Sequence, residues 1–308
     1  MKSIIMKKFF YFAAIACMAL SSCSKGDGPI EKPTPVPTPE EQVKIPINLS
    51  VGNYTRANDS AFESGDKVGI YVVNYNGSAA GTLAASGNHV NNMQFSYNGS
   101  AWTPASAIYW KDQTTHADFY AYYPYSASAN TASHSFAVQT NQSTEANYWA
   151  SDFLWGKAAN VAPTKDAVPI TTNHVFSNIL IYLKAGDGFT EETLAAATKS
   201  VKITNIKASA TINLATGVAT ATGEVTSVTP WNTGLYYRAM VVPQTVIDGT
   251  NLITVTVDGV DYTLASGAVF TANKQHKFTV TVNKSTGGVD IGIGGWETDD
   301  NEYGGSAE

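Results

Sequence analysis

Short runs in which apolar and polar residues alternate recur between residues 43 and 282, and they limit the possible folds more than any other feature of this chain. The first run places Val43, Ile45, Ile47, Leu49 and Val51 on one side. A period of two is typical of a β-strand with one buried face. Further runs rich in Val, Ile, Thr and Tyr cover residues 67–75, 118–123, 168–184, 201–214, 235–242, 252–257 and 277–282. Such residues favour strands, so the sequence predicts an all-β fold.

Two local signals refine this prediction. Asp258-Gly259 lies between two β runs, which indicates a tight hairpin turn. Residues 191–199, with Thr190 as the N-cap, are the one stretch that predicts a helix, and it is short.

The β-rich region is longer than a single β-sandwich usually needs. We therefore expect an N-terminal sandwich over residues 43–166 and a C-terminal sandwich over residues 167–296. The seam is placed in a polar, Pro-containing stretch near residues 163–168. Residues 297–308 form a short acidic tail.

The N-terminus is typical of an exported lipoprotein. Lys2, Lys7 and Lys8 precede the apolar residues 9–20, a run too short to span a bilayer but long enough for a signal peptide. Cys23 follows directly after Leu-Ser-Ser, in the manner of a lipobox. We expect residues 1–22 to be removed and Cys23 to be acylated by the lipoprotein processing machinery, which anchors the chain at the cell outer membrane. The alternative is an ordinary signal peptide with an incidental cysteine.

Residues 23–42 form a tether. Pro29, Pro33, Pro35, Pro37 and Pro39 favour an extended polyproline conformation at about 3.1 Å per residue. Such a tether would hold the folded part away from the lipid headgroups.

Cysteine usage and charge exclude several classes of function. The two cysteines are Cys17, in the signal, and Cys23, so the folded region has no disulfide, thiol nucleophile or cysteine metal site. Acidic residues outnumber basic ones, 25 to 19, and three of the lysines lie in the signal. An acidic chain is a poor match for nucleic acid.

Local motifs for catalysis, metals or cofactors are missing. His89, His116, His134, His174 and His276 are scattered, without the spacing of a zinc site, and are best interpreted as core or surface residues. Gly292, Gly294 and Gly295 lack the third glycine position and the helix of a dinucleotide site. We therefore predict no enzyme, metal or cofactor. A pair of catalytic carboxylates brought together only by the fold stays open.

The aromatic residues have two interpretations. Six tryptophans and the aromatic run at residues 119–125 could form a platform for sugars, or they could fill the core. Strand alternation would turn rings to both faces of any strand, so a structural role is favoured.

Several segments resemble the fimbrillin family, the lipoprotein-derived subunits of type V pili. They are TRA at residues 55–57, FESGDKVGIY at 62–71, IYW at 108–110, FYAYYPY at 119–125, DFLWG at 152–156, HVFSNIL at 174–180, VVPQT at 241–245, and a last strand that ends at Trp296. Each motif is weak alone, but they occur in family order along the mature chain.

This resemblance implies two tandem transthyretin-like β-sandwich domains and assembly by donor-strand exchange. In the family, an arginine-specific protease removes an N-terminal segment with the first strand, and the vacated groove accepts a strand from another pilin subunit. The chain has two arginines, and Arg238 falls in an expected ladder strand that a protease could not enter easily. Arg56 lies in a polar connection just after the first strand, so a cut between Arg56 and Ala57 would release lipid, tether and strand together. Alternatively, Arg56 is only a solvated loop residue.

The candidate donor strand contains Val289, Ile291 and Ile293, which alternate after a Gly-Gly pair. Its competing interpretation is a fixed last strand of its own sandwich. The acidic tail is poorly suited to fill a groove, which argues against a stalk position. A tip or accessory subunit, which accepts a strand but need not donate one, stays open.

Three functions are compatible with these sequence features. The favoured one is a fimbrial subunit with a role in cell adhesion to an unknown target, which requires a covered first strand and packed aromatics. A monomeric glycan-binding surface lipoprotein would expose Trp102, Trp110, Trp149 and Trp155. A β-sandwich hydrolase would need two facing carboxylates in a cleft.

Overall fold

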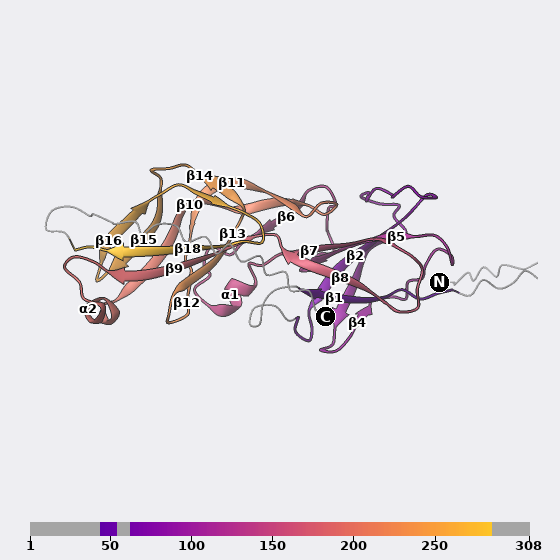
Figure 1. The fold of residues 1–308 in the computed structure, drawn as a ribbon, viewed down its shortest axis with the longest axis horizontal. Coiled ribbons are helices and arrows are strands. Elements are labelled where there is room, and N and C mark those ends of the chain that lie inside the picture. The colour runs from indigo at the N-terminus through magenta and orange to yellow at the C-terminus, as the bar shows by residue number, and fades with distance from the viewer. Residues whose placement is uncertain (1–43, 54–61, 285–308) are drawn as a thin grey trace, which may run out of the picture. The chain divides into compact units, whose positions relative to one another are not determined.

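The computed structural model describes residues 44–53 and 62–284, and this part of the chain is almost entirely β (Figure 1). The strands are short, rich in Val, Ile, Thr and Tyr, and separated by turns that contain Gly and Asn. The predicted all-β class is therefore confirmed.

One sheet has seven strands in the order β1-β8-β7-β5-β2-β3-β4. They are β1 (Asn48–Asn53), β2 (Lys67–Asn74), β3 (Val90–Tyr97), β4 (Trp102–Pro104), β5 (Ala117–Tyr123), β7 (Leu154–Val161) and β8 (Ala167–His174). All neighbours in this sheet are antiparallel except β1 and β8, which run parallel.

The remaining strands form three further sheets. The sheet β11-β10-β15-β16 also receives β6, and it contains β6 (His134–Ala137), β10 (Lys199–Asn213), β11 (Val218–Val228), β15 (Asn251–Val257) and β16 (Val260–Ala265). The sheet β12-β13-β9-β18 contains β9 (Ser177–Ala185), β12 (Trp231–Asn232), β13 (Tyr237–Val241) and β18 (Gln275–Val282). A two-stranded sheet pairs β14 (Gln244–Val246) with β17 (Ala268–Phe270).

The buried apolar side chains fall into two clusters, and β5 contributes to both. Phe119 and Ala121 belong to the cluster made by residues 47–170, whereas Tyr120 and Tyr122 belong to the cluster that extends to Val282. Both faces of this central strand are thus packed. The aromatic run therefore serves the core, as the structural interpretation of the sequence expected.

The strand pairing bears on the expected boundary after residue 166. β8 begins at Ala167 and pairs with β1 and β7, so it belongs to the sheet of the first half. β6, earlier in the chain, pairs with β10 of another sheet, so strand pairing does not follow one cut in the sequence. The division into residues 43–166 and 167–296 stays a prediction.

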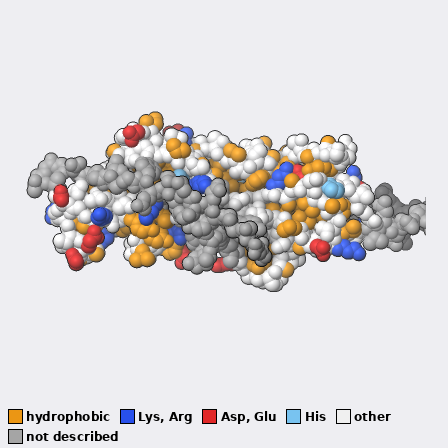
Figure 2. Space-filling view, in the orientation of Figure 1, with side chains coloured by type: hydrophobic (Ala, Val, Ile, Leu, Met, Phe, Trp, Pro, Cys, Tyr) orange, Lys and Arg blue, Asp and Glu red, His pale blue; other side chains and the backbone are white. Residues whose placement is uncertain are grey.

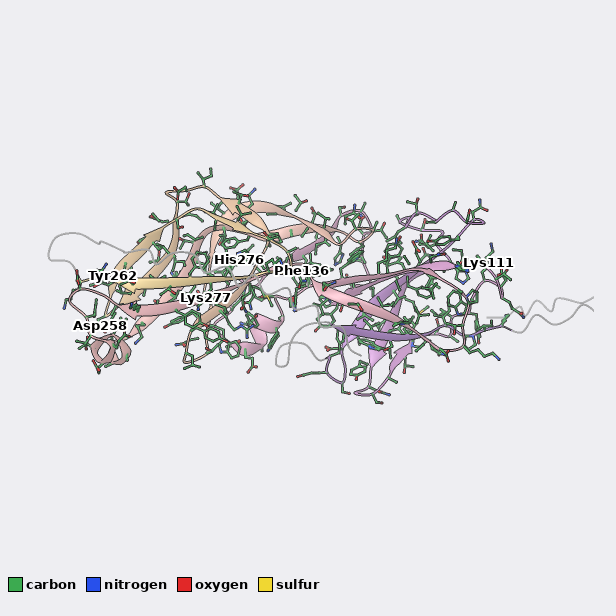
Figure 3. The ribbon with its side chains drawn as sticks, viewed as in Figure 1. Lys111, Phe136, Asp258, Tyr262, His276 and Lys277 are labelled. Atoms are coloured by element: carbon green, nitrogen blue, oxygen red, sulfur yellow. The ribbon has the colours of Figure 1, made fainter. Side chains whose placement is uncertain are left out.

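Local predictions hold in position but not always in extent. Asp258 and Gly259 form the turn between β15 and β16, with φ of 47° and 84°, as the hairpin signal predicted. Thr190 caps helix α2 (Glu191–Ala196), which ends three residues before the expected end because Lys199 begins β10. The Asp258 turn lies next to this helix end and accepts a hydrogen bond from the Thr198 N–H (Figure 3).

Two expectations need correction. The described residues contain two short helices instead of one, since α1 (Glu145–Trp149) forms after its own N-cap, Thr144. The run expected over residues 168–184 is two strands, β8 and β9, because the chain leaves one sheet at residues 175–176 and enters another.

Candidate functional site: the first strand and its groove

The first strand alternates between core and solvent as the sequence predicted. Ile47, Leu49 and Val51 are buried, with at most 6% of each residue exposed, and the residues between them are exposed. Ile45 is half-buried against the same core. Val43, the first residue of the expected run, lies outside the described residues.

Backbone hydrogen bonds hold this segment on two sides. Along β1, six residues pair in parallel with β8, from Asn48 opposite Ala167 to Asn53 opposite Thr172. Just before β1, the chain pairs with residues 108–110: the Ile47 N–H donates to the Ile108 carbonyl, and the Trp110 N–H donates to the Ile45 carbonyl, each at 2.9 Å. The segment is therefore part of the sheet ladder, not a loose extension.

Pro46 fits this ladder without losing a bond to its antiparallel neighbour. It lies opposite Tyr109 in an isolated bridge, and the two bonds of that bridge come from the residues on either side of it. At such a position a backbone N–H would point away from the partner strand, and Pro46 has none to place there. Proline is tolerated here because no donor is needed on that side.

Two tryptophans close the groove around β1. The Trp102 indole N–H donates to the Val51 carbonyl at 3.0 Å, and the Trp110 indole N–H donates to the Thr164 carbonyl at 3.1 Å. Both rings are buried, at 9% and 5% exposed. A buried indole with a satisfied N–H is a core residue, so these two rings are not available as a sugar platform.

The floor of the groove is apolar. It is formed by side chains of the cluster that also contains the first strand, namely Val68, Ile70, Val72, Phe95, Phe119, Val168 and Ile170. Removal of β1 would expose these side chains and the ladder edge of β8. The strand and the side chains beneath it are thus matched in chemistry, since all of them are apolar and buried in one cluster.

The connection after β1 contains the candidate cleavage site. β1 ends at Asn53, and the next described residue, Phe62, packs edge-on against Trp102, with ring centroids 4.9 Å apart. Arg56 and Ala57 lie between them, outside the described residues. Arg238 lies in β13 and is 6% exposed, which agrees with the expectation that a protease could not enter there.

The other predicted site residues lie outside the described ranges as well. These are Cys23, the lipidation site, and the candidate donor strand with Val289, Ile291 and Ile293. Their roles stay predictions.

The structure contains polar pairs that sequence reasoning missed. Asp118 is only 1% exposed. Its carboxylate accepts a hydrogen bond from the Asn160 N–H and forms an ion pair with Lys157, with Nζ and Oδ2 2.8 Å apart. Burial raises the pKa of the Asp118 carboxyl, but the bonds from Lys157, Asn160 and Tyr75 outweigh it and hold the pKa below its ordinary value. Nothing local in the sequence marks this pair, because the bulge between β5 and β7 brings the residues together.

The histidines do not form a metal centre in the part of the chain that the structure describes, where no group of three potential ligands occurs. His134 packs against Tyr122 and Phe153, and burial lowers its pKa. His174 pairs with Asp152 at 2.8 Å.

Charge and hydropathy add two observations. Over the described part of the visible face, Lys and Arg side chains are scattered and form no continuous basic patch (Figure 2). Between residues 44 and 284, apart from the gap at 54–61, no helix is long and apolar enough to cross a membrane.

Comparison with known proteins decides the family. The profile of the Fimbrillin-like family matches residues 55–296. The chain belongs to this family. The match covers most of the chain and confirms the resemblance seen in the sequence motifs.

A curated relative from Bacteroides uniformis, named as a fimbrium subunit, Fim1C, is 30% identical over an alignment of 318 positions that covers 95% of this chain and 98% of the relative. A crystal structure of a protein from Bacteroides uniformis, named for cell adhesion, has a TM-score of 0.61 at 23% identity and covers 83% of this chain and 98% of its own. A similarly named structure from Bacteroides ovatus has a TM-score of 0.64 at 18% identity, with the same coverage. At these identities the two structures support the fold alone. Membership of this family points to a structural protein rather than an enzyme.

Proposed function

We propose that this fimbrillin-like chain is a subunit of a type V pilus, assembled by donor-strand exchange and active in cell adhesion. The proposal rests chiefly on one observation: an apolar first strand is buried in its sheet, and the sequence that joins this strand to the rest of the fold contains Arg56. The relative named as a fimbrium subunit supports the same conclusion.

The proposed pathway begins with export. The processing machinery cuts before Cys23, acylates this cysteine and delivers the precursor to the outer membrane, with residues 23–42 as the tether. The folded part forms two tandem transthyretin-like sandwiches. An arginine-specific protease then cuts between Arg56 and Ala57, so that β1 is held by non-covalent contacts alone.

The energetics favour exchange over simple loss of the strand. Burial of Ile47, Leu49 and Val51 contributes roughly 5–9 kcal/mol in gross terms, as an upper estimate. This is similar to the whole net stability of a typical domain, about 5–15 kcal/mol. An empty groove is therefore unstable, and a strand from another pilin subunit would restore both the burial and the ladder bonds.

The candidate donor matches the groove in pattern. Val289, Ile291 and Ile293 supply three alternating apolar side chains, as many as β1 buries. The position in the fibre (stalk, tip or accessory) and the adhesion target are open within this proposal. The burial of Trp102 and Trp110 does not favour the alternative of a monomeric lipoprotein that captures glycans on a tryptophan platform.

The decisive experiment is N-terminal sequencing of protein sheared from the cell surface. We expect high-mass assemblies whose subunits begin at Ala57. An Arg56→Lys variant keeps the positive charge but removes the arginine, and it should accumulate as an acylated monomer. Wild-type protein found only as monomers with intact, acylated Cys23 would overturn the proposal.

A further inference from the structure

Four strands connect the two ends of the described chain by a short route. They are β1, which begins soon after Lys44, then β8, β9 and finally β18, which ends just before Lys284. β1 pairs in parallel with β8 over six residues, and β18 pairs in parallel with β9 over eight. Between β8 and β9 the chain has residues 175 and 176 alone. A route from one end of the described fold to the other therefore crosses two parallel ladders.

Tension between these two ends would load both ladders along the strands. A pull on Lys44 draws β1 toward its own N-terminus, while a pull on Lys284 draws β18 toward its C-terminus. β8 and β9 lie between them as one nearly continuous backbone, and β8, β9 and β18 point in the same direction in Figure 1. Because each pair is parallel, its two strands are drawn in opposite directions along their length. The hydrogen bonds of a ladder run between the strands, so under this load they must yield together.

Additional bonds fasten the first ladder. Near its start the Asn48 side-chain amide donates to the Lys165 carbonyl, and near its end the Thr172 hydroxyl donates to the Gly52 carbonyl, each at 3.2 Å. The pairing of the preceding residues with residues 108–110 resists the same pull. Sliding is also opposed by burial, because a slip by one residue would turn the apolar side chains of β1 to solvent.

The second ladder is fastened at the end where β18 would be pulled. The Gly186 N–H donates to the Val282 carbonyl at 3.0 Å. The backbone of Asp187 makes two further bonds, since its N–H donates to the Asn283 side-chain oxygen at 3.0 Å and its carbonyl accepts from the Lys284 N–H at 2.6 Å. These bonds join the chain after β9 to the chain after β18, so they share the load that enters at Lys284.

The link between the two ladders is buried. Val175 and Phe176 are at most 3% exposed, and the Val175 N–H donates to the Phe153 carbonyl at 2.8 Å. The Phe176 ring packs against Phe136, with ring centroids 5.5 Å apart. A two-residue link that is fixed in this way has little slack, so force on β8 passes directly to β9.

We propose that this chain carries tension between its two ends along the path β1–β8–β9–β18, in which two parallel ladders resist shear in series. The inference rests on the proposed function only for the source of the force, which is the pull on a surface fibre or on its anchored precursor. After exchange, a strand from another subunit that pairs in parallel with β8 would carry the load that β1 carries in the precursor. The resistance itself is a property of the single chain.

The test is single-molecule force spectroscopy on the full mature chain with Cys23→Ser. The folded region has no cysteine, so pairs of cysteines at exposed positions can serve as attachment points. Lys44→Cys with Lys284→Cys loads both ladders in shear. The control, Asn251→Cys with Ala265→Cys, uses two residues that pair at the open end of the β15–β16 hairpin, so it pulls antiparallel strands apart sideways. We expect the first pair to withstand at least about twice the force of the control at the same loading rate, because the hairpin bonds break one at a time.

Two further pairs of attachment points test the path itself. Asn173 is exposed and lies near the end of β8. Lys44→Cys with Asn173→Cys loads the first ladder, and Asn173→Cys with Lys284→Cys loads the second. Ladders in series fail at the weaker one, so the force for the whole chain should equal the lower of these two forces. A whole-chain force no higher than that of the hairpin control, or clearly below both single-ladder forces, would overturn the proposal.

This result is independent of the N-terminal sequencing experiment. If the chain resists force as expected but occurs on cells only as acylated monomers, the load path stands and the fibre role fails. If subunits that begin at Ala57 occur in assemblies but the chain yields as easily as the hairpin control, the fibre role stands and the load path fails.

Discussion

Leu49 offers the sharpest test of the idea that the first strand is an integral part of its sheet. The residue is 5% exposed and belongs to the apolar cluster beneath β1, while its neighbour Ser50 points to solvent. Replacing Leu49 by alanine deletes buried methyl groups and leaves a cavity, whereas Ser50→Ala changes only the exposed face. The two residues are neighbours in the same strand, opposite Val168 and Pro169 of β8, and they differ mainly in burial.

Buried Leu→Ala substitutions cost about 2–5 kcal/mol of stability, because the transfer free energy is lost and the cavity relaxes only in part. With a urea dependence of about 2 kcal/mol per molar, this corresponds to an unfolding midpoint lower by roughly 1–2.5 M. Ser50→Ala should stay within about 0.5 kcal/mol of the parent. Tryptophan fluorescence is a suitable probe, since Trp102 and Trp110 both lie in the core that β1 completes.

The outcome discriminates clearly. If Leu49→Ala and Ser50→Ala unfold at the same urea concentration as the parent chain, then the burial of β1 contributes nothing measurable to the free energy of unfolding. If Leu49→Ala alone is destabilised, the strand is a structural plug whose removal must be compensated. In protein cut at Arg56, the urea midpoint of Leu49→Ala should fall further as the protein is diluted, because the cut strand can then dissociate.

Two further predictions concern the frame that holds β1. Asp118→Asn should lower the free energy of unfolding at pH 7 by about 1–3 kcal/mol, because it breaks a buried, hydrogen-bonded charge. The Asp118 pKa is depressed in the folded state, so this contribution is complete above the unfolded pKa of about 3.9 and is lost as pH falls through the folded pKa. The unfolding curves of the two proteins should therefore converge in acid. A difference in stability that stays constant with pH would contradict this role of the Asp118 charge. Gly156→Ala should destabilise the sheet by about 1–3 kcal/mol, since an added Cβ would lie 2.0 Å from the Thr171 carbonyl oxygen of β8. Gly52→Ala is the matched control, because nothing lies within 4 Å of its added Cβ; thermal unfolding of the pair should separate them, and equal midpoints would refute the close approach of β7 and β8.

Local patterns account for what the sequence could predict. The alternation of Ile47, Leu49 and Val51 translates directly into burial, because the side-chain period of a strand is fixed by its backbone. Asp258-Gly259 and Thr190 likewise act through neighbouring residues, as a hairpin turn and as a helix cap. In the candidate site, these patterns identified the strand that fills the groove.

Features that depend on distant pairing could not be predicted in this way. β7 and β11 contain few buried residues in strict alternation, so their strand character is determined by the neighbours with which they pair. The parallel partner of β1 is more than a hundred residues away in the chain, and no local sequence pattern predicts this pairing. The bonds from Trp102 to Val51 and from Lys157 to Asp118 likewise exist only once the sheet has formed.

The geometry of the groove also determines what would drive the proposed exchange. The donor candidate has Val, Ile and Ile where β1 buries Ile, Leu and Val, so the two strands would bury similar apolar area and form similar ladder bonds. Before cleavage, β1 has the advantage of belonging to the same chain, and a strand from another molecule must lose translational freedom to bind. After a cut at Arg56 both competitors are separate chains, and that advantage disappears. In the proposed assembly the direction of exchange therefore comes from the irreversible cut and the removal of the freed strand, and a better-fitting donor is not required.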